Sequence, residues 1–274
     1  MATKGTDIIP EGRINHLKAC RYGWMLYNVH DLYIGKALDV YGEIEEEQVA
    51  GFRNLVKPGN VVLDIGANIG GHTVVFSKIV GPKGAVVAFE PQRFIFQTAC
   101  ANVALNSLTN VHLYHAAAGA NNGAIVVPIL DGTRELNFGG LSLGSHERGE
   151  RVRLLGIDSM KLQKCDFIKI DVEGMEADVI NGARETIEKH LPILYVENDK
   201  EAKSKELIQL IQNFGYDMYW HLPKLYNEKN FFGNAANVFE NTISINLVCV
   251  QAGKHPKITG LRRVVGPDDH WRNR

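Results

Sequence analysis

The chain has 274 residues, of which 45% are hydrophobic and 22% are charged, and a formal net charge of −1 at pH 7. This composition predicts a soluble globular protein with one large domain, and the near-neutral charge gives no electrostatic reason to expect nucleic acid or an anionic membrane as a partner. No run reaches 18 apolar residues, no signal-peptide pattern opens the chain, and four widely spaced cysteines predict reduced, mostly buried thiols in a cytoplasmic protein.

The segment before the first core strand has a weak pattern. Residues 1–20 are expected to form an irregular lead-in. Arg21 to Leu38 hold aromatic and apolar residues on both sides of a polar break, which predicts a small hairpin. Glu43 to Val56 is predicted as a helix, because its apolar residues share one face and Pro58-Gly59 stops it.

The stretch from Val61 to Ile79, VVLDIGANIGGHTVVFSKI, is the most informative part of the chain. Apolar residues lead to Asp64, a turn of small residues follows, and the apolar period then becomes helical. This pattern predicts a buried parallel strand that leads into a glycine-rich turn and a helix. Glycines let the backbone approach a ligand closely, and an aspartate at the strand tip can bind a cationic or hydroxylated group. The stretch therefore predicts a nucleotide-like cofactor.

The type of nucleotide can be narrowed. A P-loop is excluded because no Gly-Lys-Ser/Thr follows the turn, and Gly66, Gly70 and Gly71 have the wrong spacing for a dinucleotide fingerprint. The next predicted strand ends at Glu90-Pro91, and Glu90 lies about where an acidic residue binds ribose hydroxyls in nucleotide-binding α/β folds. The combination suits S-adenosylmethionine (SAM), which has a ribose and an amino-acid tail but no phosphate.

Strands and helices alternate along the rest of the chain, which predicts an α/β fold with a doubly wound, mostly parallel sheet. The expected organisation is an N-terminal hairpin and helix extension (1–57), a core domain (58–252) with a β-hairpin inserted at about 123–155, and a basic, solvated C-terminal tail (253–274). The predicted core strands are 61–65, 84–89, 110–115, 166–170, 193–196, 217–221 and 244–251, and the predicted core helices are 71–80, 92–106, 177–190 and 204–214.

Three blocks of sequence resemble a known family. They are LDIGANIG from Leu63, Phe89-Glu90-Pro91, and DFIKIDVEGME from Asp166, which is followed by VINGA. Together they resemble the FkbM family of SAM-dependent methyltransferases. The resemblance implies a class I, Rossmann-like methyltransferase fold (EC 2.1.1.-), SAM as the methyl donor, and an acceptor oxygen on a sugar, glycolipid or similar molecule.

The resemblance also implies the residues that bind SAM. Glu90, followed by Pro91, matches the residue that holds the ribose hydroxyls. Ala117 and Ala118 fall where the adenine lies. The wall around the methionine part of SAM is matched by Asp64, Gly66, Asn68 and Gly70.

Methyl transfer from SAM is an in-line displacement in which the protein aligns the acceptor and helps to remove its proton. Asp171 and Glu197 end neighbouring predicted strands, whose carboxyl ends meet at the ligand crevice of a parallel sheet. One hypothesis is a Mg²⁺ or Mn²⁺ site formed by Asp171, Glu197 and Asn198, similar to that of catechol-type O-methyltransferases. The other hypothesis is metal-free, with Asp171 or Glu173 as the general base and Lys169 orienting it.

His221, at the end of a predicted strand, is a further candidate base, although lone histidines are more often structural. The loop after it is rich in aromatic and asparagine side chains, which suits a carbohydrate acceptor or, equally, a loop whose aromatics pack into the core. Residues 137–142 of the insertion can close the other side of the pocket.

The favoured function is a SAM-dependent O-methyltransferase that acts on a small-molecule or glycan-linked hydroxyl. The alternatives are an N-methyltransferase that acts on an amine or peptide, and a SAM-binding module without catalysis.

Overall fold

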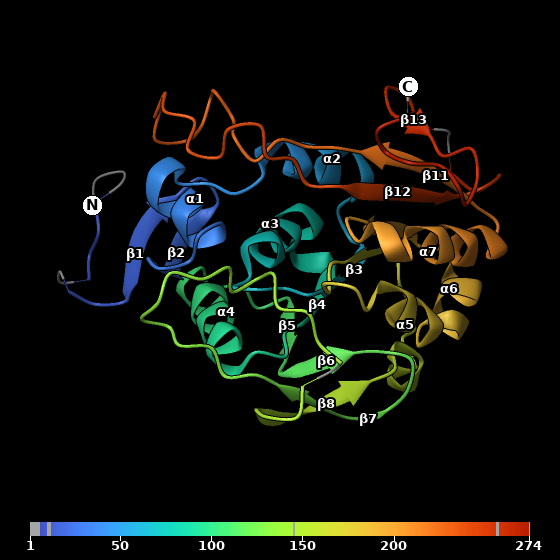
Figure 1. The fold of residues 1–274 in the computed structure, drawn as a ribbon, viewed down its shortest axis with the longest axis horizontal. Helices are drawn as coiled ribbons and strands as arrows, with labels where there is room; N and C mark the ends of the chain where they lie inside the picture. The colour runs from blue at the N-terminus through green and yellow to red at the C-terminus, as the bar shows by residue number, and fades with distance from the viewer. Residues whose placement is uncertain (1–5, 10–11, 145, 256–257, 274) are drawn as a thin grey trace.

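The computed structural model describes residues 6–9, 12–144, 146–255 and 258–273. Its centre is an eight-stranded sheet of order β13-β11-β12-β10-β9-β3-β4-β5 (Figure 1). The five strands from β10 to β5 are parallel, whereas β12 is antiparallel to both of its neighbours. The predicted doubly wound, mostly parallel α/β sheet is therefore confirmed. Its strands are β3 (Val61–Ile65), β4 (Ala85–Phe89), β5 (Val111–Tyr114), β9 (Phe167–Ile170), β10 (Ile193–Glu197), β11 (Tyr216–His221), β12 (Asn246–Gln251) and β13 (Arg262–Arg263).

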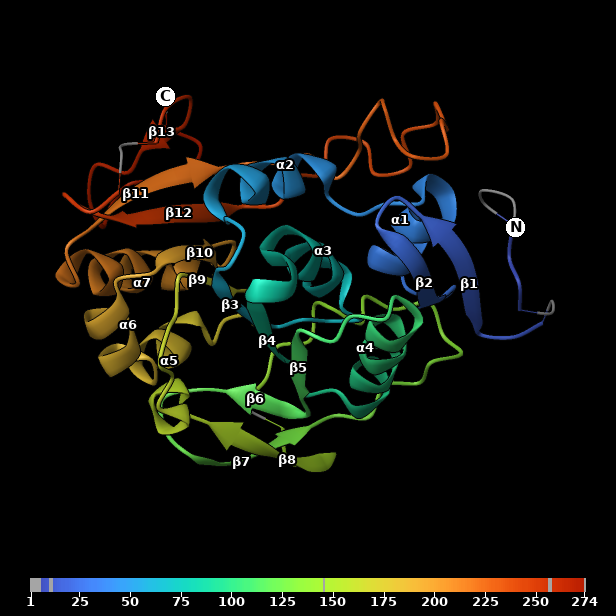
Figure 2. The same cartoon turned by 180° about the vertical axis from the view of Figure 1, so that it is seen from behind.

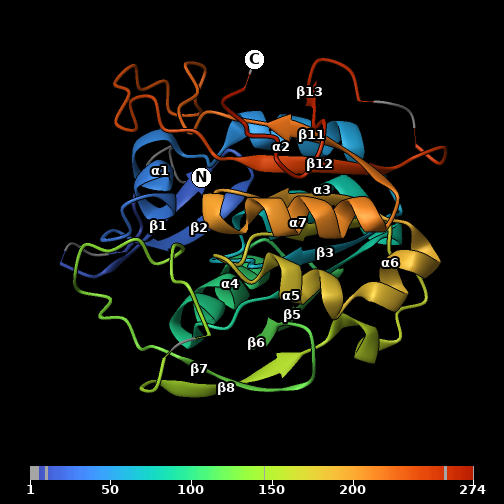
Figure 3. The same cartoon turned by 45° about the vertical axis from the view of Figure 1, so that its right-hand side comes forward.

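Helices cover both faces of this sheet, because its central strands are apolar on both sides. Figure 2 shows α2 (Glu46–Leu55) and α3 (Gly71–Val80) on one face, where Phe52 and Phe76 pack on Phe167. Figure 3 shows α5 (Glu176–Asn181), α6 (Arg184–His190) and α7 (Glu201–Asn213) on the other face. The described residues include no helix long and apolar enough to cross a membrane.

The connection from β5 to β9 differs from the other crossovers, because the described residues between them form no α-helix. A three-stranded sheet takes its place, formed by β6 (Ala116–Ala118), β7 (Gly123–Val127) and β8 (Glu150–Leu155), with the 3-10 helix η2 (Ile157–Met160). The antiparallel β7–β8 pair confirms the predicted hairpin, and β6 adds a strand parallel to β8. Because no helix fills this connection, the long loop between β7 and β8 can extend to the carboxyl ends of the strands of the main sheet.

The N-terminal prediction is wrong in two places. Residues 15–20 are not irregular, because β1 (Asn15–Cys20) pairs antiparallel with β2 (Gly23–Asn28). Residues 34–41 form α1 (Ile34–Tyr41) instead of the second arm of a hairpin. Gly35 permits this arrangement, since a Cβ there would overlap the carbonyl oxygen of Asn28. Residues 1–5 and 10–11 of the expected lead-in lie outside the described residues.

The C-terminal segment is also more ordered than predicted. β13 pairs with β11, and Val264 and Asp269 are buried, so the solvated-tail prediction is wrong for these residues. Asp269 is buried and accepts hydrogen bonds from Arg262 Nη1 (2.9 and 3.0 Å) and from Trp220 Nε1 (3.2 Å). The basic side chain of Arg262 is thus ion-paired within the structure and not free in solvent.

One predicted helix is divided in two, and another lies close to its predicted bounds. The predicted helix over 177–190 is divided into α5 and α6 at Gly182, where a Cβ would overlap the carbonyl oxygen of Gly119. The predicted helix over 92–106 is α4 (Arg93–Leu105), and a short 3-10 helix, η1 (Gly81–Lys83), follows α3. All four cysteines are free, and three are buried, as expected.

Asn102 of α4 connects the N-terminal hairpin to the core. Its fully buried side chain accepts a hydrogen bond from Leu26 N (2.6 Å) and donates to Leu26 O (3.0 Å) and Ile69 O (2.8 Å). Asn102→Ala would leave these buried backbone groups unpartnered, so we expect the free energy of unfolding to fall by about 2–4 kcal/mol in urea titrations. The exposed Asn121→Ala is the control, and equal losses in both variants would contradict this assignment.

Candidate active site

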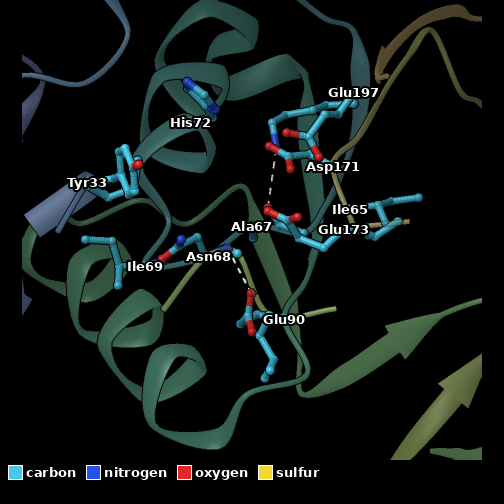
Figure 4. A pocket seen from close by; sticks show the side chains of 18 of the residues that line it. Tyr33, Ile65, Ala67, Asn68, Ile69, His72, Glu90, Asp171, Glu173 and Glu197 are labelled. Atoms are coloured by element: carbon cyan, nitrogen blue, oxygen red, sulfur yellow. Dashed lines mark hydrogen bonds and ion pairs between the residues drawn. The ribbon is translucent and has the colours of Figure 1, made fainter. Parts of the chain in front are cut away.

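A cavity of about 320 Å³ opens at the carboxyl ends of β3, β4, β9 and β10. Its wall combines segments that are far apart in the sequence: the turn after β3, the ends of β9 and β10, the loop between β7 and β8, and residues between β11 and β12. Figure 4 shows Asn68 and Glu90 gathered at one end of this pocket, with Asp171 and Glu197 at another and His72 and Tyr33 apart from both. Parallel strands explain the location, because their ends meet at one edge of the sheet.

The glycine-rich turn is fixed by two features. Gly66 has a φ of 84°, and a Cβ there would overlap the carbonyl oxygen of Asp171, so the ends of β3 and β9 can approach only with glycine at this position. Glu90 holds the turn from β4, since its two carboxylate oxygens accept hydrogen bonds from Asn68 N (3.0 Å) and Gln92 N (2.8 Å) (Figure 4). Burial raises the pKa of Glu90 to about 7, against the opposing effect of these two N–H groups.

The insertion closes the cavity above this turn. Gln92 Nε2 donates a hydrogen bond to Phe138 O (2.7 Å), which ties the loop to the start of α4. Asn137, Gly139, Gly140 and Leu141 line the cavity, as predicted for this segment. Ala117 and its two neighbours in β6 are buried and form part of the wall.

Lys169 is a buried cation in the floor of the cavity. Its Nζ lies 3.0 Å from Asp171 Oδ2, 3.3 Å from Gly66 O and 3.7 Å from Asp64 Oδ1. Burial lowers the pKa of Lys169, but the two carboxylates outweigh it and leave the pKa raised. Burial likewise raises the pKa of Asp171, and the Lys169 ammonium outweighs it, so that this pKa is lowered. Both groups are therefore charged at neutral pH.

Two of the residues expected to surround the methionine part of SAM do not line the cavity. Asp64 is fully buried below the turn, where its carboxylate accepts a hydrogen bond from Thr73 Oγ1 (2.6 Å). Gly70 is the N-cap of α3 and adopts a left-handed conformation (φ 82°). Both residues support the turn on the side away from the cavity, whereas Gly66 and Asn68 form part of the cavity wall.

Three carboxylates gather at the ends of β9 and β10. Asp171, Glu173 and Glu197 each offer an oxygen atom within 4.8 Å of the others. Burial raises the pKa of Glu197 well above its usual value, and the negative charges of Asp171 and Glu173 raise it further. Lys200 Nζ donates to Glu173 Oε2 (2.6 Å), so two of the three carboxylates already have an ammonium partner.

Asn198 does not belong to this cluster, which corrects the predicted metal triad. Its Nδ2 donates a hydrogen bond to Ser204 Oγ (2.9 Å), and the residue does not line the cavity. β10 ends at Glu197, and the side chain of Asn198 after it is directed to Ser204 of α7 and not to the cavity.

His221 also lies outside the cavity, which removes it as a candidate base. Its Nδ1 shares a hydrogen bond with Tyr195 Oη (2.8 Å), and it lines a separate hollow beneath α2. In the loop after it, Tyr226 and Phe232 pack against the hydrophobic cluster that contains Tyr41. The structure thus confirms the core-packing interpretation of these aromatic side chains.

Among the cavity residues that the sequence interpretation missed are Tyr33, Glu45 and His72. The Tyr33 ring is 39% exposed and stacks on Phe239 at a centroid distance of 6.2 Å and an interplanar angle of 9°. His72 Nε2 lies 3.4 Å from Glu45 Oε2. The sequence feature that could have indicated this group is His72 itself, a histidine within an apolar helical stretch directly after the glycine-rich turn.

The fold and the site define a class of protein. The sheet places the glycine-rich turn after β3 and an acid after the neighbouring β4, and the antiparallel strand β12 lies between the parallel strands and β11. This is the arrangement of a class I SAM-dependent methyltransferase. Residues 64–218, more than half of the chain, match the model of the methyltransferase FkbM domain. The chain belongs to the FkbM methyltransferase family.

Individual relatives are more distant. The chain is 29% identical over 172 residues to the 2-O-methyltransferase NoeI of Sinorhizobium fredii, a match that covers 56% of this chain and 69% of that protein. A crystal structure of methyltransferase FkbM from Methylobacillus flagellatus KT is 17% identical with a TM-score of 0.46, and the match covers 73% of this chain and 50% of that one. Precorrin-6y C5,15-methyltransferase from Geobacter metallireducens GS-15 is 12% identical with a TM-score of 0.48, over 75% and 89% of the two chains.

Proposed function

We propose that this methyltransferase transfers the methyl group of SAM to a hydroxyl of a sugar or another small polyhydroxylated acceptor. The observation that carries the proposal is an ionised carboxylate, Asp171, held in place by the buried Lys169 in a cavity that also presents an exposed aromatic ring, Tyr33. The name of the relative NoeI, a 2-O-methyltransferase, supports an oxygen acceptor.

SAM would lie with its ribose at Glu90, its adenine at Ala117 and its amino-acid part at the turn of Gly66 and Asn68. The charge of the cavity suits this ligand. Among the described lining residues, Lys169 is the only lysine or arginine, against six carboxylates: Glu45, Glu90, Asp171, Glu173, Glu197 and Asp199. Those of the six groups that are ionised, Asp171 among them, attract the sulfonium cation of SAM and hold the neutral thioether product less tightly.

The acceptor would enter beside Tyr33. The ring is supported from behind by its stacking on Phe239, so its outer face is available to the apolar face of a sugar ring. Asn137, Thr242 and Ser244 line the same cavity and offer hydrogen-bond partners for hydroxyl groups. Asp171 would bind one acceptor hydroxyl and keep a negative charge near the sulfonium, and Lys169 would orient Asp171.

Transfer would proceed without a metal ion. The acidic cluster offers hard oxygen ligands, but Asp171 and Glu173 already have ammonium partners in Lys169 and Lys200, so their charge is compensated without a divalent cation. We therefore expect exhaustive EDTA treatment to leave the methylation rate unchanged. A rate that is lost with EDTA and restored by Mg²⁺ or Mn²⁺ would contradict this expectation.

The proposed reaction is tested with SAM labelled on its methyl group. A panel of methyl pyranosides and a panel of primary amines are incubated with the enzyme, and mass spectrometry identifies the methylated atom. We expect label on a pyranoside hydroxyl. Label on amines alone would favour the N-methyltransferase alternative, and calorimetric SAM binding without transfer to either panel would favour a non-catalytic module.

A further inference from the structure

Two cavity side chains, Glu45 and His72, have no part in the function as proposed so far. Glu45 is the N-cap residue of α2, and its backbone is left-handed (φ 40°, ψ 50°), a conformation that side-chain-bearing residues rarely adopt. It does not cap the helix, since its side chain accepts no hydrogen bond from the first turn. The carboxylate lines the cavity instead. Unusual backbone conformations of this kind cluster at functional sites.

His72 faces the same space from the first turn of α3. The residue is 7% exposed, and its buried Nε2 has no hydrogen-bond partner in the described part of the chain. Glu45 Oε2 lies 3.4 Å away. The imidazole is fixed by its edge contact with Phe52, at a centroid distance of 5.1 Å and an angle of 87°. Buried polar atoms normally have partners, so this ring nitrogen is placed to bind the neighbouring Glu45 carboxylate in the working site.

The electrostatic surroundings give the two groups different roles. Burial raises the pKa of Glu45 to about 7, and the charge of Asp171 adds to the effect while Lys169 opposes it. Burial lowers the pKa of His72 to about 3, so this ring is neutral. The other titratable groups that face Glu45 are Lys169 and Asp171 from β9 and Tyr195 from β10. Each of these keeps its charge state across neutral pH, and Glu45 alone among them titrates there.

We propose that Glu45 is the catalytic base of methyl transfer and that His72 is the residue that positions it. This inference rests on the proposed O-methyltransferase function. The acceptor oxygen forms a bond to the methyl carbon, the S–C bond of SAM breaks with its electron pair remaining on sulfur, and the hydroxyl proton moves to Glu45 Oε2. A sulfonium and a carboxylate thus become a thioether and a carboxylic acid. Asp171 binds a neighbouring hydroxyl, and the neutral His72 donates its Nε2–H to Glu45.

The variant Glu45→Gln tests the base directly. With labelled SAM and the methyl pyranoside that wild type methylates best, we expect kcat to fall about 100- to 10,000-fold. The calorimetric Kd for SAM should stay within about twofold of wild type, because Glu45 contacts the acceptor and not the cofactor. The control is Glu47→Gln, an exposed acid two residues along the same helix that does not line the cavity, and it should leave kcat unchanged.

The pH profile separates a base from a structural residue. A base acts when it is ionised, so kcat/KM of wild type for the acceptor, measured at saturating SAM so that the titration of Glu90 does not contribute, should rise with pH through about 7 and level off above it. Glu45→Gln should lack this acidic limb. His72→Phe removes a donor to the ionised carboxylate, so it should move the limb to higher pH and lower kcat about tenfold, whereas His72→Gln, which retains an N–H donor, should restore part of the activity.

The outcomes distinguish the inference from the function on which it rests. If wild type methylates no hydroxyl, the proposed function fails. If wild type does so but Glu45→Gln retains kcat within about threefold, or keeps the acidic limb, only the assignment of Glu45 is overturned. Infrared titration gives a readout that needs no acceptor: a carboxyl band absent from Glu45→Gln should titrate near pH 7. Titration of that band at the ordinary pKa of glutamate would overturn the inference.

Discussion

Glu90→Gln is expected to weaken SAM binding about 30- to 1,000-fold, which corresponds to about 2–4 kcal/mol. The carboxylate is buried, and each oxygen accepts one backbone N–H, from Asn68 or Gln92, which leaves lone pairs for the two ribose hydroxyls. An amide at this position loses the charge, and its NH₂ group faces one of these backbone donors. Isothermal titration calorimetry with SAM and with its demethylated product measures the loss.

The dependence of SAM affinity on pH gives a second readout for Glu90. Burial raises its pKa to about 7, so acidification protonates the carboxylate and removes an acceptor. Affinity of wild type for SAM should therefore fall as the pH drops from about 8 to 6, and that of Glu90→Gln should change little. Glu150→Gln, an acid that pairs with Arg93 at the surface, is the control, with unfolding midpoints recorded for all variants. Wild-type affinity in Glu90→Gln would refute the ribose assignment.

Lys169→Met should lower the free energy of unfolding by about 3–5 kcal/mol at pH 8 and abolish methyl transfer. Its ammonium is buried beside two carboxylates, Asp171 at 3.0 Å and Asp64 at 3.7 Å. Methionine fills a similar volume but leaves the fully buried Asp64 and the partly exposed Asp171 without their cation. Urea unfolding followed by circular dichroism measures the change in stability.

The sign of the pH dependence identifies the cause of that loss. Without Lys169, desolvation holds the folded-state pKa of Asp64 and Asp171 above the unfolded value, so these groups cost stability when they ionise and cost less as the pH falls. The difference between variant and wild type should therefore shrink from pH 8 towards pH 5. Lys205→Met, which breaks an exposed pair with Asp268, should cost at most about 1 kcal/mol at either pH. A loss that is independent of pH would show that packing, and not charge, is the reason.

The predictable parts of the site are those whose position is fixed by a single strand and the turn that follows it. β3, the glycine-rich turn and α3 form one continuous segment, so the change of apolar period locates them without any tertiary information. Glu90 and Asp171 were predictable for a similar reason, because each directly follows a strand and parallel strands end at one edge.

The wrong predictions share a different cause. Asn198 follows Glu197 directly, and proximity in sequence suggested one site, but the chain leaves β10 after Glu197 and the Asn198 amide binds Ser204. His221 also ends a strand, but β12 lies between β11 and β10, so His221 is displaced from the crevice. Which way a side chain points at the end of a strand depends on its neighbours in space.

By itself, the sequence determined the parallel core, the cofactor turn and the family, because these depend on local periodicity and on residues close together in the chain. Only the tertiary structure decided which side chains meet in the cavity. Tyr33 and Glu45 come from the N-terminal extension, His72 from α3, and Asn137 from the insertion. Their approach depends on long-range packing, as in the hydrogen bonds of Asn102 to Leu26 and Ile69, and on burial, which sets the charge of each group. Neither can be deduced from local pattern, since both arise from contacts between residues distant in the chain.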